Sequence, residues 1–182
     1  MSVLREFTNA KHREAEGKPF VQYLLGGTIT KEHYVMYLQQ MFPVYAILEY
    51  YAELAGLIQD LPDLKRSNYI LRDLAEFNSG YPSNKYESTQ KYRKHIEELF
   101  YTPEKRHLLL AHIYVRHMGD LYGGKIIAKR VPGSGLAYQF EDRPTLIKAL
   151  DAKLTTDLVE EALIGFDLSM GIFDELQEKI NE

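Results

Sequence analysis

Apolar residues along this chain recur at the spacing of an α-helix, and no stretch alternates apolar with polar residues between hairpin turns. A chain patterned in this way buries stripes of helix surface and cannot supply the two faces of a sheet. The sequence therefore predicts an all-α fold. Its 182 residues, 45% of them hydrophobic and 26% charged, are typical of one globular domain, which we expect to cover residues 1–182.

Capping residues, glycines and prolines indicate where the helices end. Helices are expected over about residues 3–16, 20–25, 30–59, 64–77, 88–100, 103–130, 143–153 and 156–180. The first should bury a stripe made of Leu4, Phe7, Lys11 or His12, and Ala15. Pro43 should bend the third helix, and residues 78–84 should form a linker.

The composition excludes several classes of function. A formal charge of −4 argues against a general nucleic-acid surface, and the longest apolar runs, such as Leu108–Ala111, fall far short of the ~20 residues that span a bilayer. The first residues lack the apolar core of a signal peptide, so we expect a cytoplasmic protein. With no cysteine, any tightly held metal must use histidine or carboxylate ligands. Fourteen tyrosines and no tryptophan leave many ring hydroxyls in need of partners.

Glycines interrupt the helix expected over residues 103–130. Gly119 and Gly123 are four residues apart and share a helix face, with Gly124 beside them, and each mid-helix glycine costs about 0.5–1 kcal/mol relative to alanine. The bare backbone could be a notch for packing another helix, or it could let a flat ligand approach closely. Asp120 beside this notch could hold a water over the ligand, or it could be an ordinary solvated residue.

The six histidines allow more than one interpretation. His12 precedes Glu16 by one turn, so the carboxylate could hold one imidazole nitrogen while the other binds a metal, although a buried histidine of the core has the same pattern. His33, His95 and His107 are expected at the surface. His112 and His117 could be core residues or could support a site. A carboxylate-bridged di-iron centre needs two Glu-x-x-His motifs, and only Glu104–His107 supplies one.

Residues 110–124 (LAHIYVRHMGDLYGG) resemble the signature of the heme oxygenases, which is close to A-H-x-Y-x-R-Y-L-G-D-L-S-G-G. The chain departs from that pattern at His117, where the family has tyrosine, and at Tyr122, where it has serine. Residues 11–16 (KHREAE) resemble the family's proximal-histidine segment. Phe166 and residues 173–176 (FDEL) resemble its last helix.

The resemblance implies an all-α fold that sandwiches heme between a proximal and a distal helix. His12 would be the axial iron ligand, with Glu16 holding its other ring nitrogen. Gly119 and Gly123 would let the distal backbone lie against the porphyrin. Asp120 would organise distal waters, with Tyr45 and Arg116 as partners, for proton delivery.

The resemblance also implies a set of heme contacts. Arg5 and Tyr114 fit the propionates, for which Arg143 and Lys148 are further candidates, and Gly124 and Phe166 complete the heme-binding set. Tyr122 could crowd the distal waters or point outward, and His117 adds a titratable group near them.

The implied activity is that of a heme oxygenase, for which heme b is both cofactor and substrate. Heme would be cleaved with O2, and with electrons from a ferredoxin or a reductase, to biliverdin (cleaved at the α-meso carbon, giving biliverdin IXα), CO and Fe2+. Lys125, Lys129 and Arg130 could form a basic patch for the donor, or an ordinary solvated face. A non-heme di-iron oxidase and a protein that stores heme without degrading it are the alternatives.

Overall fold

The computed structural model describes residues 2–82 and 85–182, and within these ranges it contains helices and no strand. The all-α prediction is confirmed. The main helices are α1 (Val3–Glu16), α2 (Pro19–Gly26), α3 (Lys31–Leu54), α4 (Ser67–Glu76), α5 (Glu87–Tyr101), α6 (Leu109–Ile113), α7 (Gly119–Ala128), α8 (Arg143–Asp151) and α9 (Val159–Asn181). No helix in the described part of the chain combines the length and apolar content needed to cross a bilayer.

Most helix ends lie where local chemistry predicts them. The Ser2 hydroxyl accepts the backbone N–H of Leu4 at the start of α1, and the Thr30 hydroxyl accepts that of His33 at the start of α3. The third helix runs through Pro43 but ends at Leu54 rather than near residue 59, because Gly56 takes a left-handed conformation with φ of 80°. Residues 83–84, at the end of the expected linker, lie outside the described residues.

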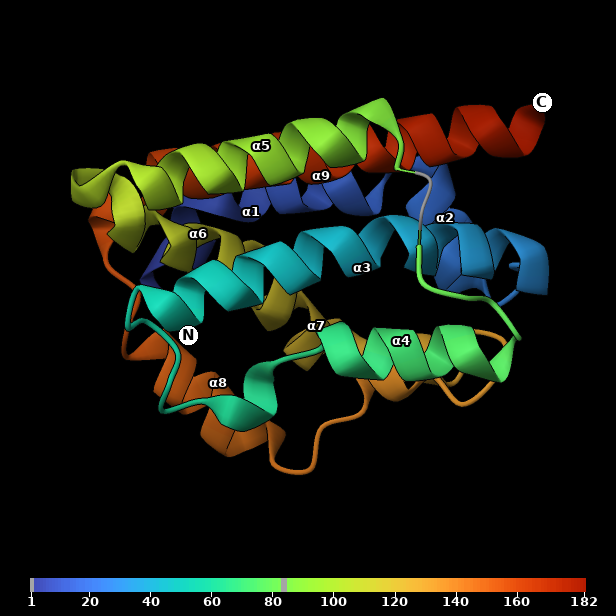
Figure 1. Cartoon of the computed structure of the whole chain (residues 1–182), viewed down its shortest axis with the longest axis horizontal. Coiled ribbons are helices and arrows are strands. Elements are labelled where there is room, and N and C mark those ends of the chain that lie inside the picture. The colour runs from blue at the N-terminus through green and yellow to red at the C-terminus, as the bar shows by residue number, and fades with distance from the viewer. Residues whose placement is uncertain (1, 83–84) are drawn as a thin grey trace.

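Helix α3 packs against α5 on one side and α4 on the other, while α9 packs against α1 and α5 (Figure 1). The stripe expected on α1 is partly wrong. Leu4 and Ala15 are buried, but Phe7 is 54% exposed because it lies at the edge of the buried face.

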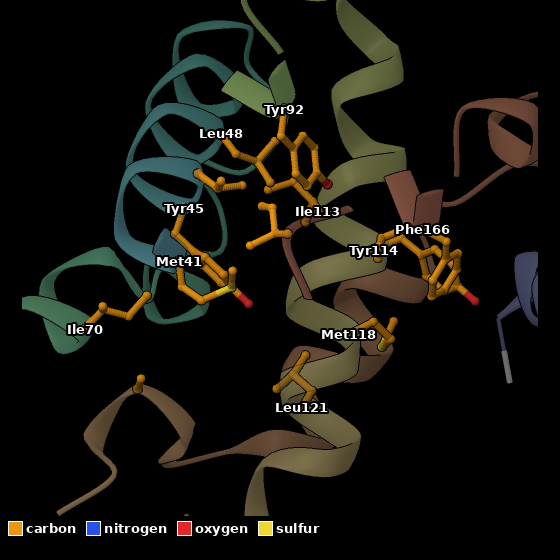
Figure 2. Packing of buried hydrophobic residues seen from close by; sticks show 14 of the residues in the cluster. Met41, Tyr45, Leu48, Ile70, Tyr92, Ile113, Tyr114, Met118, Leu121 and Phe166 are labelled. Carbon is orange, nitrogen blue, oxygen red and sulfur yellow. The ribbon is translucent and has the colours of Figure 1, made fainter. Parts of the chain in front are cut away.

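The helix expected over residues 103–130 is irregular. It begins as the 3₁₀-helix η2 (Pro103–Leu108), becomes α6, widens into the π-helical turn η3 (Tyr114–Met118) and continues as α7. We call the segment Leu109–Ala128 the irregular helix. Figure 2 shows Tyr45 and Leu48 of α3 on one side of it, and Tyr114 and Phe166 on the other. A π-turn is a common feature of helices at functional sites.

A buried polar cluster joins α5, α6 and α9. His112 Nε2 lies 2.7 Å from Glu161 Oε1, the same oxygen is hydrogen-bonded to His95, and the Tyr92 hydroxyl lies 2.9 Å from His112 Nδ1. Burial alone would raise the pKa of Glu161, but the hydrogen bonds from the two histidines lower it from 4.5 to about 2. His95, expected at the surface, is therefore half-buried, as is His33, whereas His107 is exposed.

Because folding lowers the pKa of Glu161, its contribution to stability is complete above pH 4.5 and is lost as the pH falls through about 2. We expect the free energy of unfolding of Glu161→Gln to lack this part of the pH dependence, amounting to up to about 3 kcal/mol. Urea unfolding measured between pH 2 and pH 7 would detect it. The control is Glu160→Gln, at an exposed neighbouring residue. If the free energy of unfolding depended on pH in the same way in both variants, the prediction would be contradicted.

Candidate functional site

The backbone of the irregular helix is bare at two of its glycines. A Cβ added to Gly119 would meet no heavy atom within 4 Å, and one added to Gly123 would meet only Ile127 Cδ1 at 4.0 Å. Tyr122 and Ile126, on the same face, are 54% and 53% exposed. Tyr122 therefore lies on the open face and not in the core. Neither glycine is a notch filled by another helix.

His12 lies on α1 with its imidazole half exposed, and its Nε2 is 3.6 Å from Glu16 Oε1. The carboxylate thus faces one ring nitrogen, and the other can bind a metal. Phe166 of α9 packs against the imidazole with the ring centroids 6.0 Å apart. This is the pairing of His12 and Glu16 that the sequence predicted.

A hydrogen bond ties α1 to the irregular helix. The hydroxyls of Thr8 and Tyr114 lie 2.9 Å apart in a buried position. Thr8 precedes His12 by one turn and Tyr114 precedes Gly119 by five residues, so this bond fixes the histidine-bearing helix to the glycine-bearing one. Thr8 was not among the predicted site residues, because a lone threonine in a helix has no distinguishing pattern.

Asp120 is buried behind the bare glycines, and its Oδ2 accepts a hydrogen bond of 2.6 Å from the Tyr45 hydroxyl. Burial raises the pKa of Asp120 above its ordinary value, although the Arg116 charge and the Tyr45 hydrogen bond oppose the shift. Arg116 is itself buried, with its guanidinium 3.1 Å from Ser169 Oγ and over the Tyr45 ring. The structure thus brings Asp120, Tyr45 and Arg116 together.

A cavity of ≈10 Å³, with room for about one water, borders Asp120. Tyr45, Arg66 and Tyr138 line it, and the Tyr138 hydroxyl is 2.7 Å from that of Tyr37. Arg66, Tyr37 and Tyr138 were not among the predicted site residues. The unusual number of tyrosines was the only signal, and it could not say which of them meet.

His117, where the family signature has tyrosine, is fully buried next to Tyr45. Its Nε2 lies 2.8 Å from Glu49 Oε1, and Glu49 also accepts the backbone N–H groups of Arg66 and Ser67. Burial alone would raise the pKa of Glu49, but the hydrogen bond and charge of His117 and these N–H groups lower it. His117 therefore links the irregular helix to α3 directly behind Tyr45.

Two expected heme contacts are placed differently. A Cβ at Gly124 would lie 3.0 Å from the Tyr138 carbonyl oxygen and 3.3 Å from Arg143 Nη1, so Gly124 faces the polypeptide and not the open face. The Arg143 guanidinium donates to the carbonyls of Asp120 and Leu121, at 3.0 and 2.8 Å, and to that of Tyr138. Arg143 holds the 138–143 segment against α7, because a guanidinium has enough donors to bind several carbonyls at once. Gly124 allows that segment to approach the helix closely.

Arg5 and Lys148 are both exposed. Burial raises the pKa of the Tyr114 hydroxyl, while the Thr8 hydrogen bond and the nearby charge of Arg5 oppose the shift. The charge of Arg5 therefore acts on the hydroxyl that is bonded to Thr8. The half motif for a di-iron centre is exposed, with His107 paired to Asp157 at 3.4 Å.

The arrangement offers an imidazole free to bind a metal on one helix and a bare backbone on another, with a buried carboxylate and a water-sized cavity behind it. The exposed Arg5 lies on the same helix as His12, and its charge acts on the Tyr114 hydroxyl. These features fit a flat, anionic, metal-bearing ligand, and heme has this shape and charge.

Comparison with known proteins agrees with this chemistry. The family model described as heme oxygenase matches residues 1–156. A heme oxygenase from Guillardia theta is 33% identical, with 96% of this chain and 84% of that protein aligned. Heme oxygenase 2 from Oryctolagus cuniculus is 29% identical over 97% of this chain, which spans 65% of its length.

Solved structures give the same result. The heme oxygenase of Leptospira interrogans superposes with a TM-score of 0.83 at 30% identity, covering 96% of this chain and all of that one. Heme oxygenase-1 from Synechocystis, solved in complex with heme, has a TM-score of 0.80 at 25% identity and covers 98% of this chain and 94% of that one.

The glycines should respond differently to alanine. Gly119 has helical backbone angles and open space at Cβ, so Gly119→Ala should raise the free energy of unfolding by about 0.5–1 kcal/mol. Gly124→Ala would push a methyl group against the Tyr138 carbonyl and should lower it by roughly 1–3 kcal/mol. Chemical denaturation of the heme-free protein tests both, and destabilisation by Gly119→Ala would show that this face is filled.

Proposed function

The chain belongs to the heme oxygenase family and is a heme oxygenase enzyme, and from this premise we propose how its residues act. The proposed reaction cleaves heme b with O2 and externally supplied electrons to biliverdin IXα, CO and Fe2+. When bound, heme supplies both the redox-active iron and the macrocycle that is opened.

The observation that carries the proposal is the open space over Gly119 and Gly123, on a helix tied by Tyr114 to the helix of His12. Side chains at these two positions would fill the space that a porphyrin needs. In our proposal the glycines let the helix backbone lie close to the porphyrin, so little room remains between them for O2. This steric restriction would select the meso carbon that is attacked.

On the proximal side, His12 would hold the heme iron. The Glu16 carboxylate lies 3.6 Å from Nε2, so it would orient the ring and, on closing to hydrogen-bond distance, raise the basicity of the ligand. Phe166 limits rotation of the ring by packing against it.

On the distal side we assign proton delivery to Asp120. Its Oδ2 is held by the Tyr45 hydroxyl, and the cavity beside it can hold a water that relays a proton. The raised pKa of this carboxyl favours a group that can carry a proton. Arg116 stays charged in the core. Its charge attracts the Asp120 carboxylate and so helps to position that carboxylate.

At the pocket edge, we assign the propionates to Arg5, Tyr114 and Lys148. Arg5 and Lys148 are exposed cations, and the charge of Arg5 acts on the Tyr114 hydroxyl. We propose a ferredoxin or a reductase as electron donor, docking near Lys125 of α7 and Lys129, which directly follows that helix; both are exposed. Arg130 contributes less, because it is bound to the Leu25 carbonyl.

His12→Ala removes the axial ligand, so hemin added to this variant should lack the absorption spectrum of a histidine-bound heme. Added imidazole should restore it by occupying the space that the side chain leaves. His107→Ala, altered at an exposed histidine, should bind hemin like the unmodified protein. An unchanged spectrum in His12→Ala would remove His12 from the proposal.

Asp120→Asn keeps the shape of the side chain but cannot hold and release a proton. We expect it to bind hemin with unchanged affinity while bilin formation with reduced ferredoxin slows by about 10²–10⁴-fold, the usual contribution of a positioned acid. Glu178→Gln, at an exposed carboxylate of α9, should turn over normally. If the unmodified protein bound heme and formed no bilin, the heme-storage alternative would hold instead.

A further inference from the structure

The cluster of His95, His112 and Glu161 has no part in the proposed heme reaction. It joins one histidine of α5, one of α6 and a carboxylate of α9, and its ligand atoms all lie within 4.8 Å of one another. No other group of three or more such residues with this spacing occurs in the part of the chain that the structure describes. We propose that these three side chains form a binding site for a divalent transition-metal ion, best suited to Zn²⁺.

The donor set fits this ion. Two imidazoles and one carboxylate are the protein ligands of a zinc site that keeps its fourth position open. A tetrahedral ion with bonds of about 2.0–2.2 Å would hold its ligand atoms roughly 3.3 Å apart. His112 Nε2 is 2.7 Å from Glu161 Oε1, so the side chains must separate by about half an ångström. His95 has room to move, since its side chain is 25% exposed and offers a route for entry.

The protons can be rearranged without loss of charge balance. In the metal-free cluster both Nε2 atoms face the carboxylate oxygen and donate N–H to it. Metal binding needs the Nε2 lone pairs, so each ring must carry its proton on Nδ1 instead. His112 Nδ1 can then donate to the Tyr92 hydroxyl, which is 2.9 Å away. Each ring proton moves from Nε2 to Nδ1, and none is gained or lost.

The surroundings hold the ligands in place. Tyr92 is fully buried, and its hydroxyl fixes the orientation of the His112 ring, as residues that support metal ligands commonly do. Gly165 of α9 makes room for that ring, because a Cβ there would lie 3.2 Å from His112 Nδ1. A bound ion would join α5, α6 and α9 at one point.

The test is a calorimetric titration of the chelator-treated, heme-loaded full chain with Zn²⁺. Loading with heme engages His12 and removes the His12–Glu16 pair as a competing site. We expect one ion per chain, and saturating Zn²⁺ should raise the melting temperature by about 5–10 °C at a hundredfold excess over the dissociation constant.

Three variants make the test specific. His95→Asn, at the edge of the cluster, should weaken Zn²⁺ binding at least about tenfold, and Tyr92→Phe should weaken it by about 10–100-fold through loss of the supporting hydroxyl. His107→Asn, at an exposed histidine, should bind Zn²⁺ normally. Retained heme binding and helical circular dichroism would show that each variant folds. Absence of saturable binding at one ion per chain, or unchanged binding by His95→Asn, would overturn the proposal and leave a hydrogen-bonded cluster only.

Discussion

The structure depends on how the irregular helix satisfies the polar side chains that it carries into the core. Buried polar groups must find partners, since leaving one unpaired costs about 1–3 kcal/mol. Each of these side chains has at least one partner of its own, although the buried Arg116 Nε and His117 Nδ1 atoms have none among the described residues. His112 is held by Tyr92 and Glu161, Arg116 by Ser169, His117 by Glu49, and Asp120 by Tyr45. The partners come from α3, α5 and α9, so the same hydrogen bonds that position Asp120 also assemble the bundle.

Much of this fold follows from local sequence. The first helix was predicted at its observed bounds, because apolar spacing defines it and Gly17 and Pro19 follow it. The expected third helix was too long because the left-handed turn at Gly56 is not implied by apolar spacing. The π-turn at Tyr114–Met118 was not predicted either. The π-turn depends on packing on both sides of the helix. None of its residue types is characteristic of a turn that contains one extra residue.

The candidate site also has a part that could be predicted from the sequence and a part that could not. His12 with Glu16, and Gly119 with Gly123, are neighbours in sequence, so helix geometry alone places each pair. Contacts between distant residues could not be deduced from spacing. Arg143 was expected at a propionate because it is a cation in the right region, but it binds the carbonyls of Asp120 and Leu121. His95 was expected at the surface because its partner, Glu161, lies 66 residues further along the chain.

The π-turn has a consequence for which insertions and deletions this chain can tolerate. A π-turn takes one residue more than an α-helical turn for nearly the same rotation and rise, so removing one residue between Tyr114 and Met118 would restore regular α-geometry and leave α7 aligned with α6. Gly119 and Gly123 would keep their direction relative to α6. Removing one residue between Gly119 and Gly123, where the helix is regular, would instead turn the rest of α7 by about 100°. The π-turn is therefore the place in this helix that tolerates the loss of a residue.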